Sequence, residues 1–349
     1  MFGGRSHEHQ ISCLSARTVV DAARAAGHTP VTVGVDRQGR FVRCDVPVAK
    51  PGLLPEVGDG PTTTLMRTRE QVDVVTFNDD GTVTTAEPVD VAFAVMHGAG
   101  GEDGTIQGLF DTLGLPYVGA NVAASALGVD KIAMKQQFAA AGLPQVPFVA
   151  VTRPAFTASP QTVVDEIARR LHAPWFVKPA CEGSSFGISR IDDPNALDDA
   201  IRHAFTFGAR VIVEEGVVGA RELEVGVIGD ADPEITVPGE IVSAHTFYDF
   251  DAKYTVSSTL NIPADVPESL VEQIKRLATV AYQAIGCTGL ARVDFFLTGE
   301  QLLVNEINTI PGFTAHSMFP MLWAHEGVPF PQLVDRLISD ALHAAKPNG

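Results

Sequence analysis

Residues Gly289–Ser317 read GLARVDFFLTGEQLLVNEINTIPGFTAHS, and two apolar runs in this stretch flank a turn-prone segment. The runs are Val293–Leu297 and Leu302–Ile307, and the segment between them contains Gly299. Two such runs joined by a short glycine-containing segment predict a β-hairpin.

Polar side chains are expected to gather on one face of the hairpin. Side chains alternate along a strand, so Arg292 and Asp294 share a face, and Val304, Glu306 and Asn308 are expected to share a face on the second strand. A turn near residue 300 puts Asp294 roughly opposite Glu306. Two carboxylates and an amide oxygen suit Mg²⁺, which takes a few carboxylates plus substrate phosphates. The alternative is an ordinary half-buried hairpin with solvated polar residues.

Length and composition exclude several classes of protein. A chain of 349 residues is expected to form two or three domains. The net charge of −17 argues against a nucleic-acid partner, which would need clustered Lys and Arg. No apolar run approaches the roughly 20 residues of a membrane span, and no signal-peptide pattern is visible. The four cysteines form no CxxC pair, which favours reduced thiols in the cytoplasm.

The start of the chain has a glycine turn followed by a helix and a strand. Gly3-Gly4 leads into a helix expected at about Ile11–Ala26, and Thr29–Val35 is expected to be extended. This order is typical of α/β nucleotide-type folds. The strand expected before the turn is almost absent, which indicates either a late start or a chain that lacks it. Ser6 and Glu8 could simply cap the helix and compensate its dipole.

A second ligand-binding segment is expected at the end of a buried strand. Phe41–Pro88 is interpreted as inserted β-hairpins, and Val89–Met96 as a strand that is apolar on both faces, as in parallel sheets. That strand delivers His97 and a glycine-rich segment at its carboxyl end, where ligands bind in open α/β sheets. A single helix is predicted from Ser125 to Ala141.

A strand and a loop of small residues predict a phosphate site. Trp175–Pro179 is expected to be a strand that leads Lys178 into the loop 180–188. Backbone N–H groups in such a loop can bind phosphates while lysine supplies positive charge. The loop does not match the Walker A pattern, and a plain hairpin turn is the alternative.

Acidic residues follow on two further strands, predicted at Arg210–Val217 and Arg221–Ile228. Glu214, Glu215 and Glu222 either line a solvated edge or accept hydrogen bonds from an adenine amine and ribose hydroxyls. The residues alone do not decide between these alternatives.

In combination, these motifs resemble the ATP-grasp superfamily, and within it the D-alanine–D-alanine ligases, over nearly the whole chain. The motifs are GGRSHEH at 3–9, HGAGGEDGTIQG at 97–108, DKIAMK at 130–135, KPACEGSSFG at 178–187, TFYDFDAKY at 246–254, ARVDFF at 291–296 and NEINTIPGFTAHSMFP at 305–320. The pairing of the TFYDFDAKY and NEINTIPGF segments is hard to obtain by chance.

The resemblance implies an α/β, ATP-grasp fold with an N-terminal Rossmann-like (pre-ATP-grasp) domain. The implied domains are a substrate-binding domain at 1–123, a central lid domain at 124–213 and a catalytic domain at 214–349. The implied activity is ATP-dependent ligation of two D-alanine molecules through an acyl phosphate, for peptidoglycan precursor synthesis. ATP and two Mg²⁺ or Mn²⁺ ions are implied, together with a cytoplasmic homodimer that binds no nucleic acid or membrane.

The resemblance also implies roles for individual residues. ATP would be contacted by Lys131, Lys178, Glu182, Ser185, Glu214, Glu215, Val217, Glu222, Phe247 and Lys253. The metal ions would be held by Asp294, Glu306 and Asn308. The residues that act on the D-alanine substrates would be Glu8, His97, Ser184, Tyr254, Arg292, Gly312 and Ser317.

Within the last group, Glu8 would bind the ammonium of the first D-alanine, near His97. Ser184 and Tyr254 would join Glu8 in a hydrogen-bonded set beneath two lid loops, 181–187 and 246–256. The Arg292 side chain and the Gly312 N–H would stabilise an oxyanion, and Ser317 would bind the carboxylate of the second D-alanine.

Three other functions compete with this interpretation. A ligase that forms D-alanyl-D-lactate would differ in the lid segment, where this chain has Lys253-Tyr254. A non-catalytic nucleotide-binding regulator would have no need of the intact set of Lys, Arg and acidic residues. A Rossmann dehydrogenase would need GxGxxG after a full first strand, whereas this chain offers only Gly3-Gly4-Arg5-Ser6.

Overall fold

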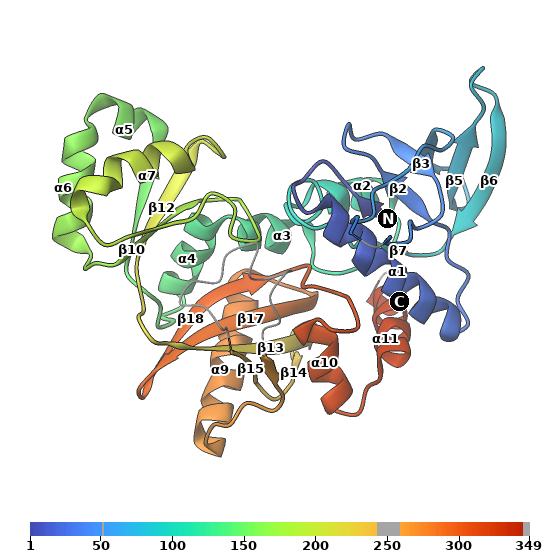
Figure 1. Ribbon diagram of the computed structural model, residues 1–349. Coiled ribbons are helices and arrows are strands. Elements are labelled where there is room, and N and C mark those ends of the chain that lie inside the picture. Colours follow the sequence, from blue (N-terminus) through green and yellow to red (C-terminus); the bar gives the residue numbers. More distant parts are fainter. Residues whose placement is uncertain (51, 243–258, 345–349) are drawn as a thin grey trace.

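The computed structural model describes residues 1–50, 52–242 and 259–344. Figure 1 shows three groups of elements: the first, from blue to teal, the second, from green to yellow-green, and the third, from dark yellow to red. The predicted hairpin is central to the third group. It consists of β17 (Gly289–Thr298) and β18 (Gln301–Asn308), joined by a two-residue turn with Gly299 at a φ of +58°.

The first group contains two small sheets, each with one parallel pair of strands, and an inserted antiparallel sheet of three strands. Its elements are β1 (Phe2–Gly3), α1 (His9–Ala25), β2 (Val33–Val35), β3 (Phe41–Arg43), β4 (Thr63–Arg67), β5 (Val72–Phe77), β6 (Val83–Val89), β7 (Ala92–Phe93), α2 (Thr105–Leu113) and β8 (Tyr117–Val118). Strand β1 pairs in parallel with β2, and β7 pairs in parallel with β8. Strands β4, β5 and β6 form the predicted hairpins.

The first strand is short but present. The Met1 ammonium donates to the Phe93 carbonyl at 2.7 Å, and the Val95 N–H donates to the Met1 carbonyl at 3.0 Å. The Ser12 hydroxyl accepts from the Gly3 N–H and donates to the Val95 carbonyl. These bonds connect β1 to β7, so the turn that carries Glu8 lies beside the segment that carries His97.

The second group contains a four-stranded antiparallel sheet, and the helices within residues 153–204 pack on it. Its elements are α3 (Val122–Val129), α4 (Lys131–Ala140), β9 (Phe148–Thr152), α5 (Arg153–Ala158), α6 (Pro160–Arg170), β10 (Trp175–Pro179), β11 (Ser189–Ile191), the 3₁₀ helix η1 (Pro194–Ala196), α7 (Leu197–Ala204) and β12 (Arg210–Glu215). The strand order is β11-β10-β12-β9. In α7 the buried residues Leu197, Ala200, Ile201 and Ala204 follow helical spacing and pack on this sheet.

The single helix predicted from Ser125 to Ala141 is wrong. Asp130 separates α3 from α4, because its backbone is extended and its carboxylate accepts hydrogen bonds from the Ile132 and Ala133 N–H groups. The same carboxylate also pairs with Arg210 at the start of β12. The cap of α4 and the ion pair with Arg210 therefore separate two helices that the sequence pattern predicts as one.

The third group is built on the hairpin. Its elements are β13 (Arg221–Gly229), β14 (Glu234–Ile235), β15 (Gly239–Val242), β16 (Thr259–Asn261), α9 (Glu268–Ala284), β17, β18, α10 (Met318–His325) and α11 (Phe330–Ala344). The sheet order is β16-β15-β13-β17-β18, with β14 paired to β13. Helix α9 packs on one face together with α4, whose Met134 and Phe138 lie in the same apolar core. Helices α1 and α11 share a second core and lie side by side (Figure 1).

The predicted pairing of Asp294 with Glu306 is confirmed, but the predicted face of Val304 is wrong. The register shifts between Asp294 and Phe295, so that Asp294 pairs with Glu306 while Phe295 pairs with Val304. Asn305 is therefore the extra residue of a β-bulge, which interrupts the alternation of side chains. As a result Val304 lies in the core, on the face opposite the acids. In the parts of the chain that the structure describes, no helix is long and apolar enough to span a membrane.

Candidate active site

The hairpin brings a buried arginine and acidic residues together. Arg292 donates to both carboxylate oxygens of Asp294, with both distances at 2.7 Å. The neighbouring strand β13 contributes Glu224, which lies directly across from Asp294 and 3.0 Å from the Arg292 Nε. All three residues are less than a tenth exposed. Burial lowers the pKa of Arg292, but Asp294 and Glu224 outweigh it and raise that pKa above its usual range.

Two lysines meet one carboxylate beside the hairpin. Glu214, at the end of β12, is only 3% exposed. One of its oxygens is 2.5 Å from Lys178 Nζ, and the other is 3.1 Å from Lys135 Nζ. Burial raises the pKa of Glu214, but the two ammonium groups lower it to a net value of about 2. Lys178 and Glu214 were both predicted as nucleotide contacts, and the structure brings them together.

Glu306 connects the hairpin to the lysines. Its carboxylate is close enough to favour the charged forms of Lys178, Lys135 and Arg292. Burial lowers the pKa of Lys178, but Glu214, Glu306 and Glu222 raise it to a net value above normal. The predicted metal ligand Glu306 therefore lies within electrostatic range of the predicted phosphate ligand Lys178.

The loop after β10 closes over Glu8. The Ser184 hydroxyl donates to the Glu8 carboxylate, which confirms the predicted link between residues 176 positions apart. Ser184 and Ser185 have φ values of 46° and 61°, a left-handed conformation that L-residues seldom adopt and that is often found at functional sites. A Cβ on Gly183 would lie 2.8 Å from a Glu8 oxygen, so the loop backbone approaches this carboxylate closely.

His97 lies in a buried chain of polar groups near Glu8. Its Nε2 is 3.0 Å from the Ser15 hydroxyl, and its Nδ1 is 3.4 Å from Glu102. Burial lowers the pKa of His97, but Glu102 and Glu8 outweigh it and raise the pKa above its usual value. His97 therefore lies near Glu8, the residue predicted to bind the first substrate.

The remaining predicted residues are placed in two further groups. Lys131, the first residue of α4, donates to the Glu182 carbonyl at 2.7 Å. It therefore contacts the loop 180–188, which is the predicted phosphate site. In the turn after β18, a Cβ on Gly312 would lie 2.9 Å from the Ser317 hydroxyl. That hydroxyl accepts from the Thr314 N–H at 3.1 Å. Gly312 and Ser317 are therefore adjacent, as the resemblance implies.

Some predicted residues are not brought together with the others. The Glu215 carboxylate accepts from the His172 N–H at 2.8 Å, on the opposite side of β12 from Glu214. Val217 follows β12, and among the described residues it makes no contact that bears on a role. Phe247, Lys253 and Tyr254 lie outside the described residues.

Sequence reasoning missed three charged residues. Glu224 alternates with Glu222 on β13, and this spacing could have revealed it. Glu102 lies in the glycine-rich segment after His97. Lys135 lies within the DKIAMK motif, but only the fold shows that it is buried beside Glu214.

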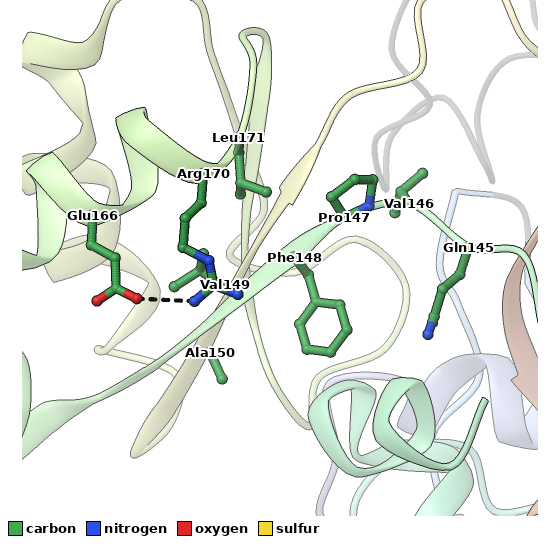
Figure 2. A pocket seen from close by; sticks show the side chains of 9 residues that line it. All are labelled: Gln145, Val146, Pro147, Phe148, Val149, Ala150, Glu166, Arg170 and Leu171. Atoms are coloured by element: carbon green, nitrogen blue, oxygen red, sulfur yellow. Dashed lines mark hydrogen bonds and ion pairs between the residues drawn. The ribbon is translucent and has the colours of Figure 1, made fainter. Parts of the chain in front are cut away.

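A separate pocket lies beside β9 and α6 of the second group of elements (Figure 2). It is lined by residues 145–150 and by Glu166, Arg170 and Leu171, with Arg170 and Glu166 paired at 2.9 Å. No residue of the predicted active site lines it, so the pocket is not assigned to the reaction.

The hairpin residues fit a hard divalent cation. Within residues 1–50, 52–242 and 259–344, no group of three His, Cys, Asp or Glu could hold a metal ion. The hairpin set instead has two acids, Asp294 and Glu306, and the amide of Asn308, which leaves positions for water and phosphate oxygens. Magnesium favours this kind of incomplete oxygen set. The bulge at Asn305 is what turns Glu306 and Asn308 to the face of Asp294.

Known proteins of one family are similar to this chain over nearly its whole length. Residues 1–120 match the family model of the D-ala D-ala ligase N-terminus, and residues 137–339 match that of the C-terminus. A D-alanine–D-alanine ligase of Geobacillus kaustophilus is 42% identical over 346 residues, covering 98% of this chain and 93% of the relative. One of Pseudarthrobacter chlorophenolicus is 41% identical over 357 residues, with the same two coverages.

Solved structures of ligases are also similar to this chain over nearly its whole length. The D-alanine–D-alanine ligase from Coxiella burnetii has a TM-score of 0.80 and 33% identity, covering 99% of this chain and 94% of that one. The VanG D-Ala:D-Ser ligase from Enterococcus faecalis has a TM-score of 0.81 and 31% identity, covering 97% of each chain. The predicted α/β, ATP-grasp fold is thereby confirmed. This chain belongs to the D-alanine–D-alanine ligase family.

Proposed function

We propose that this protein joins two D-alanine molecules to D-alanyl-D-alanine with consumption of ATP, through an acyl phosphate, for peptidoglycan precursor synthesis. Membership of the ligase family supports the reaction class. The observation that carries the proposal is the pair of buried ion-pair clusters, Lys178 with Glu214 and Arg292 with Asp294, because they supply the charges that ATP-dependent carboxylate activation needs.

The chemistry explains why so many charges are buried in one place. An amine does not displace oxide from a carboxylate, so the carboxylate is first phosphorylated. That step brings two anions together, and positioning and electrostatics supply most of its catalysis. Lys178 and Lys131 are proposed to bind the ATP phosphates, while Glu214 and Glu222 accept hydrogen bonds from the adenine amine and the ribose. Divalent cations held by Asp294, Glu306 and Asn308 would neutralise phosphate charge.

The second step produces an oxyanion at the attacked carbonyl. Arg292 is proposed to stabilise it together with the Gly312 N–H, since donors aimed at a developing oxyanion are effective in a buried site. Asp294 and Glu224 hold the guanidinium in place before substrates bind. Ser317, adjacent to Gly312, is proposed to bind the carboxylate of the second D-alanine.

Glu8 is proposed to bind the ammonium of the first D-alanine. The loop 181–187 already contacts this carboxylate through Ser184, which supports its role as a lid that excludes water from the acyl phosphate. The other predicted lid, 246–256, lies outside the described residues.

The identity of the second substrate needs a direct test. One similar solved structure is described as a D-Ala:D-Ser ligase, whereas the curated relatives named above are D-alanine–D-alanine ligases. Product formation should therefore be measured near neutral pH with D-alanine alone and with added D-serine or D-lactate. We expect the D-alanyl-D-alanine product to dominate; preference for either mixed product would overturn this assignment.

The reaction itself is tested by phosphate release from ATP. We expect release to require D-alanine and a divalent cation, and to match dipeptide formation one to one. Folded protein that releases no phosphate with D-alanine would favour a nucleotide-binding regulator instead.

We also propose domains at 1–123, 124–213 and 214–349, a cytoplasmic location and a homodimer. The separate apolar core of the second sheet supports a lid domain that moves as a unit. Helix α4 is an exception, because it packs on the third sheet. Sedimentation at micromolar concentration tests the dimer, and limited proteolysis tests the domain boundaries.

A further inference from the structure

Lys135 is a buried cation to which the reaction outlined above gives no role. It lies in α4 and is 1% exposed. A buried ammonium is costly unless it is paired and hydrogen-bonded. Its partners must therefore compensate the cost of burying its charge.

The two groups that Lys135 contacts belong to different parts of the site. Its Nζ lies 3.1 Å from Glu214 and 3.5 Å from the carbonyl oxygen of Asn305. Glu214 ends β12 on the proposed nucleotide side. Asn305 is the extra residue of the bulge in β18, next to Glu306 on the proposed metal side.

The bulge has a specific consequence for the metal side. Unbroken alternation would put Glu306 on the same face as the core residue Val304. With Asn305 as an extra residue, Glu306 pairs with Asp294 on the active-site face. A contact to the Asn305 carbonyl therefore acts on the feature that orients Glu306.

Lys135 also contacts the nucleotide side of the site. Lys178 and Lys135 both pair with Glu214, one lysine with each carboxylate oxygen. When Lys178 turns to a phosphate, as the proposed function requires, Lys135 remains as the partner of Glu214. The Glu214 carboxylate then keeps both its charge and its orientation toward the adenine amine.

We propose that Lys135 is a positioning residue that couples the Glu214 nucleotide contact to the β18 bulge carrying Glu306. It touches neither substrate nor metal and acts through these two partners. The inference rests on the proposed function, since that function makes Glu214 a nucleotide contact and Glu306 a metal ligand.

The test compares Lys135→Met, which keeps the length of the side chain but removes its charge, with Phe138→Leu. Phe138 is fully buried one turn along the same helix and contacts the apolar core rather than the site. The control therefore loosens α4 without altering the charges. A third variant, Lys135→Arg, restores the positive charge.

Two binding constants are measured without D-alanine. ADP affinity is measured by calorimetry in the absence of divalent cations, and Mn²⁺ affinity of the ADP complex is measured by electron paramagnetic resonance. We expect Lys135→Met to weaken each by about tenfold or more, the range found when groups that orient metal ligands are removed. Phe138→Leu should change each by less than about threefold, and Lys135→Arg should recover part of the ADP affinity.

Loss of ADP affinity alone, with Mn²⁺ affinity unchanged, would overturn the coupling. Equal losses in Lys135→Met and Phe138→Leu would show that Lys135 only supports the helix. Neither binding constant involves D-alanine, so these results are independent of whether the protein forms the dipeptide. A native protein that binds both ligands but makes no dipeptide would refute the proposed function and leave the coupling intact.

One measurement does not depend on the folding of Lys135→Met. In the native protein, ADP without a divalent cation should slow amide hydrogen exchange in residues 304–307 at least severalfold, because nucleotide at Glu214 would restrain the bulge through Lys135. Unchanged exchange in this segment would refute the proposal.

Discussion

Replacing Glu214 by Gln tests the electrostatic core of the site most directly. The change keeps the shape of the side chain and removes the carboxylate that forms ion pairs with both Lys135 and Lys178. Both lysines would then be cations without their strongest partner. Removing one lysine is less disruptive, because the other still neutralises Glu214. We therefore expect Glu214→Gln to destabilise the protein more than Lys178→Met.

The magnitude follows from the pKa of Glu214, which is about 2 in the folded protein against an ordinary value of 4.5. At about 1.4 kcal/mol per pKa unit, the folded protein favours the charged carboxylate by about 3 kcal/mol. Breaking a buried ion pair by removing one partner costs about 3–5 kcal/mol in other proteins. We expect a loss of this size at pH 7.

The pH dependence has a definite sign. The folded-state pKa is depressed, so the contribution of Glu214 is fully present above about pH 4.5 and is lost as the pH falls toward 2. Between these values the native protein should lose stability more steeply than Glu214→Gln, which has no carboxylate to titrate at this position.

Urea unfolding followed by the fluorescence of Trp175 provides the assay. Trp175 is buried in β10, which pairs with β12, and the chain has only one other tryptophan, Trp323. A Trp323→Phe background therefore makes the signal report on the sheet that carries Glu214. The matched control is Glu215→Gln, because its partner His172 is 90% exposed and surface pairs contribute about 0–1 kcal/mol.

The reasoning would be refuted if Glu214→Gln changed the unfolding free energy at pH 7 by less than about 1 kcal/mol. It would also be refuted if Glu215→Gln had an equal effect, since the loss would then come from the strand end rather than from the buried charges.

Three further predictions concern turnover. Gly183→Ala should raise the KM for the first D-alanine by about tenfold or more, because the added Cβ would displace a Glu8 oxygen only 2.8 Å away. Initial rates measured against D-alanine concentration check this prediction. An unchanged KM would contradict the role of Glu8. Arg292→Lys, which keeps a positive charge beside Asp294 and Glu224, should lower kcat by at least about 100-fold. Single-turnover assays on protein that circular dichroism shows to be folded check this; near-normal turnover would exclude Arg292 from the oxyanion role. Chelation of divalent cations should abolish phosphate release and their return should restore it; release that persists in excess chelator would contradict the proposed metal role.

Short-range patterns in the sequence determined the elements of the fold. The strand predicted at Trp175–Pro179 has the bounds of β10, and the Gly299 turn fixed the pairing of the central hairpin near its end. Such features depend on neighbours within a few residues, whose spacing can be read directly. The motif resemblance likewise identified most of the residues that the structure gathers around the site.

Contacts between distant residues were decided only by the tertiary structure. The break at Asp130 is stabilised by Arg210, and the contact of Ser184 with Glu8 joins the first and second groups of elements. The burial of Lys135 against Glu214 and the bulge at Asn305 also depend on how separate elements pack. Local spacing cannot encode these features, because the energy of a buried charge or of an interrupted strand depends on partners that only the complete fold brings within reach.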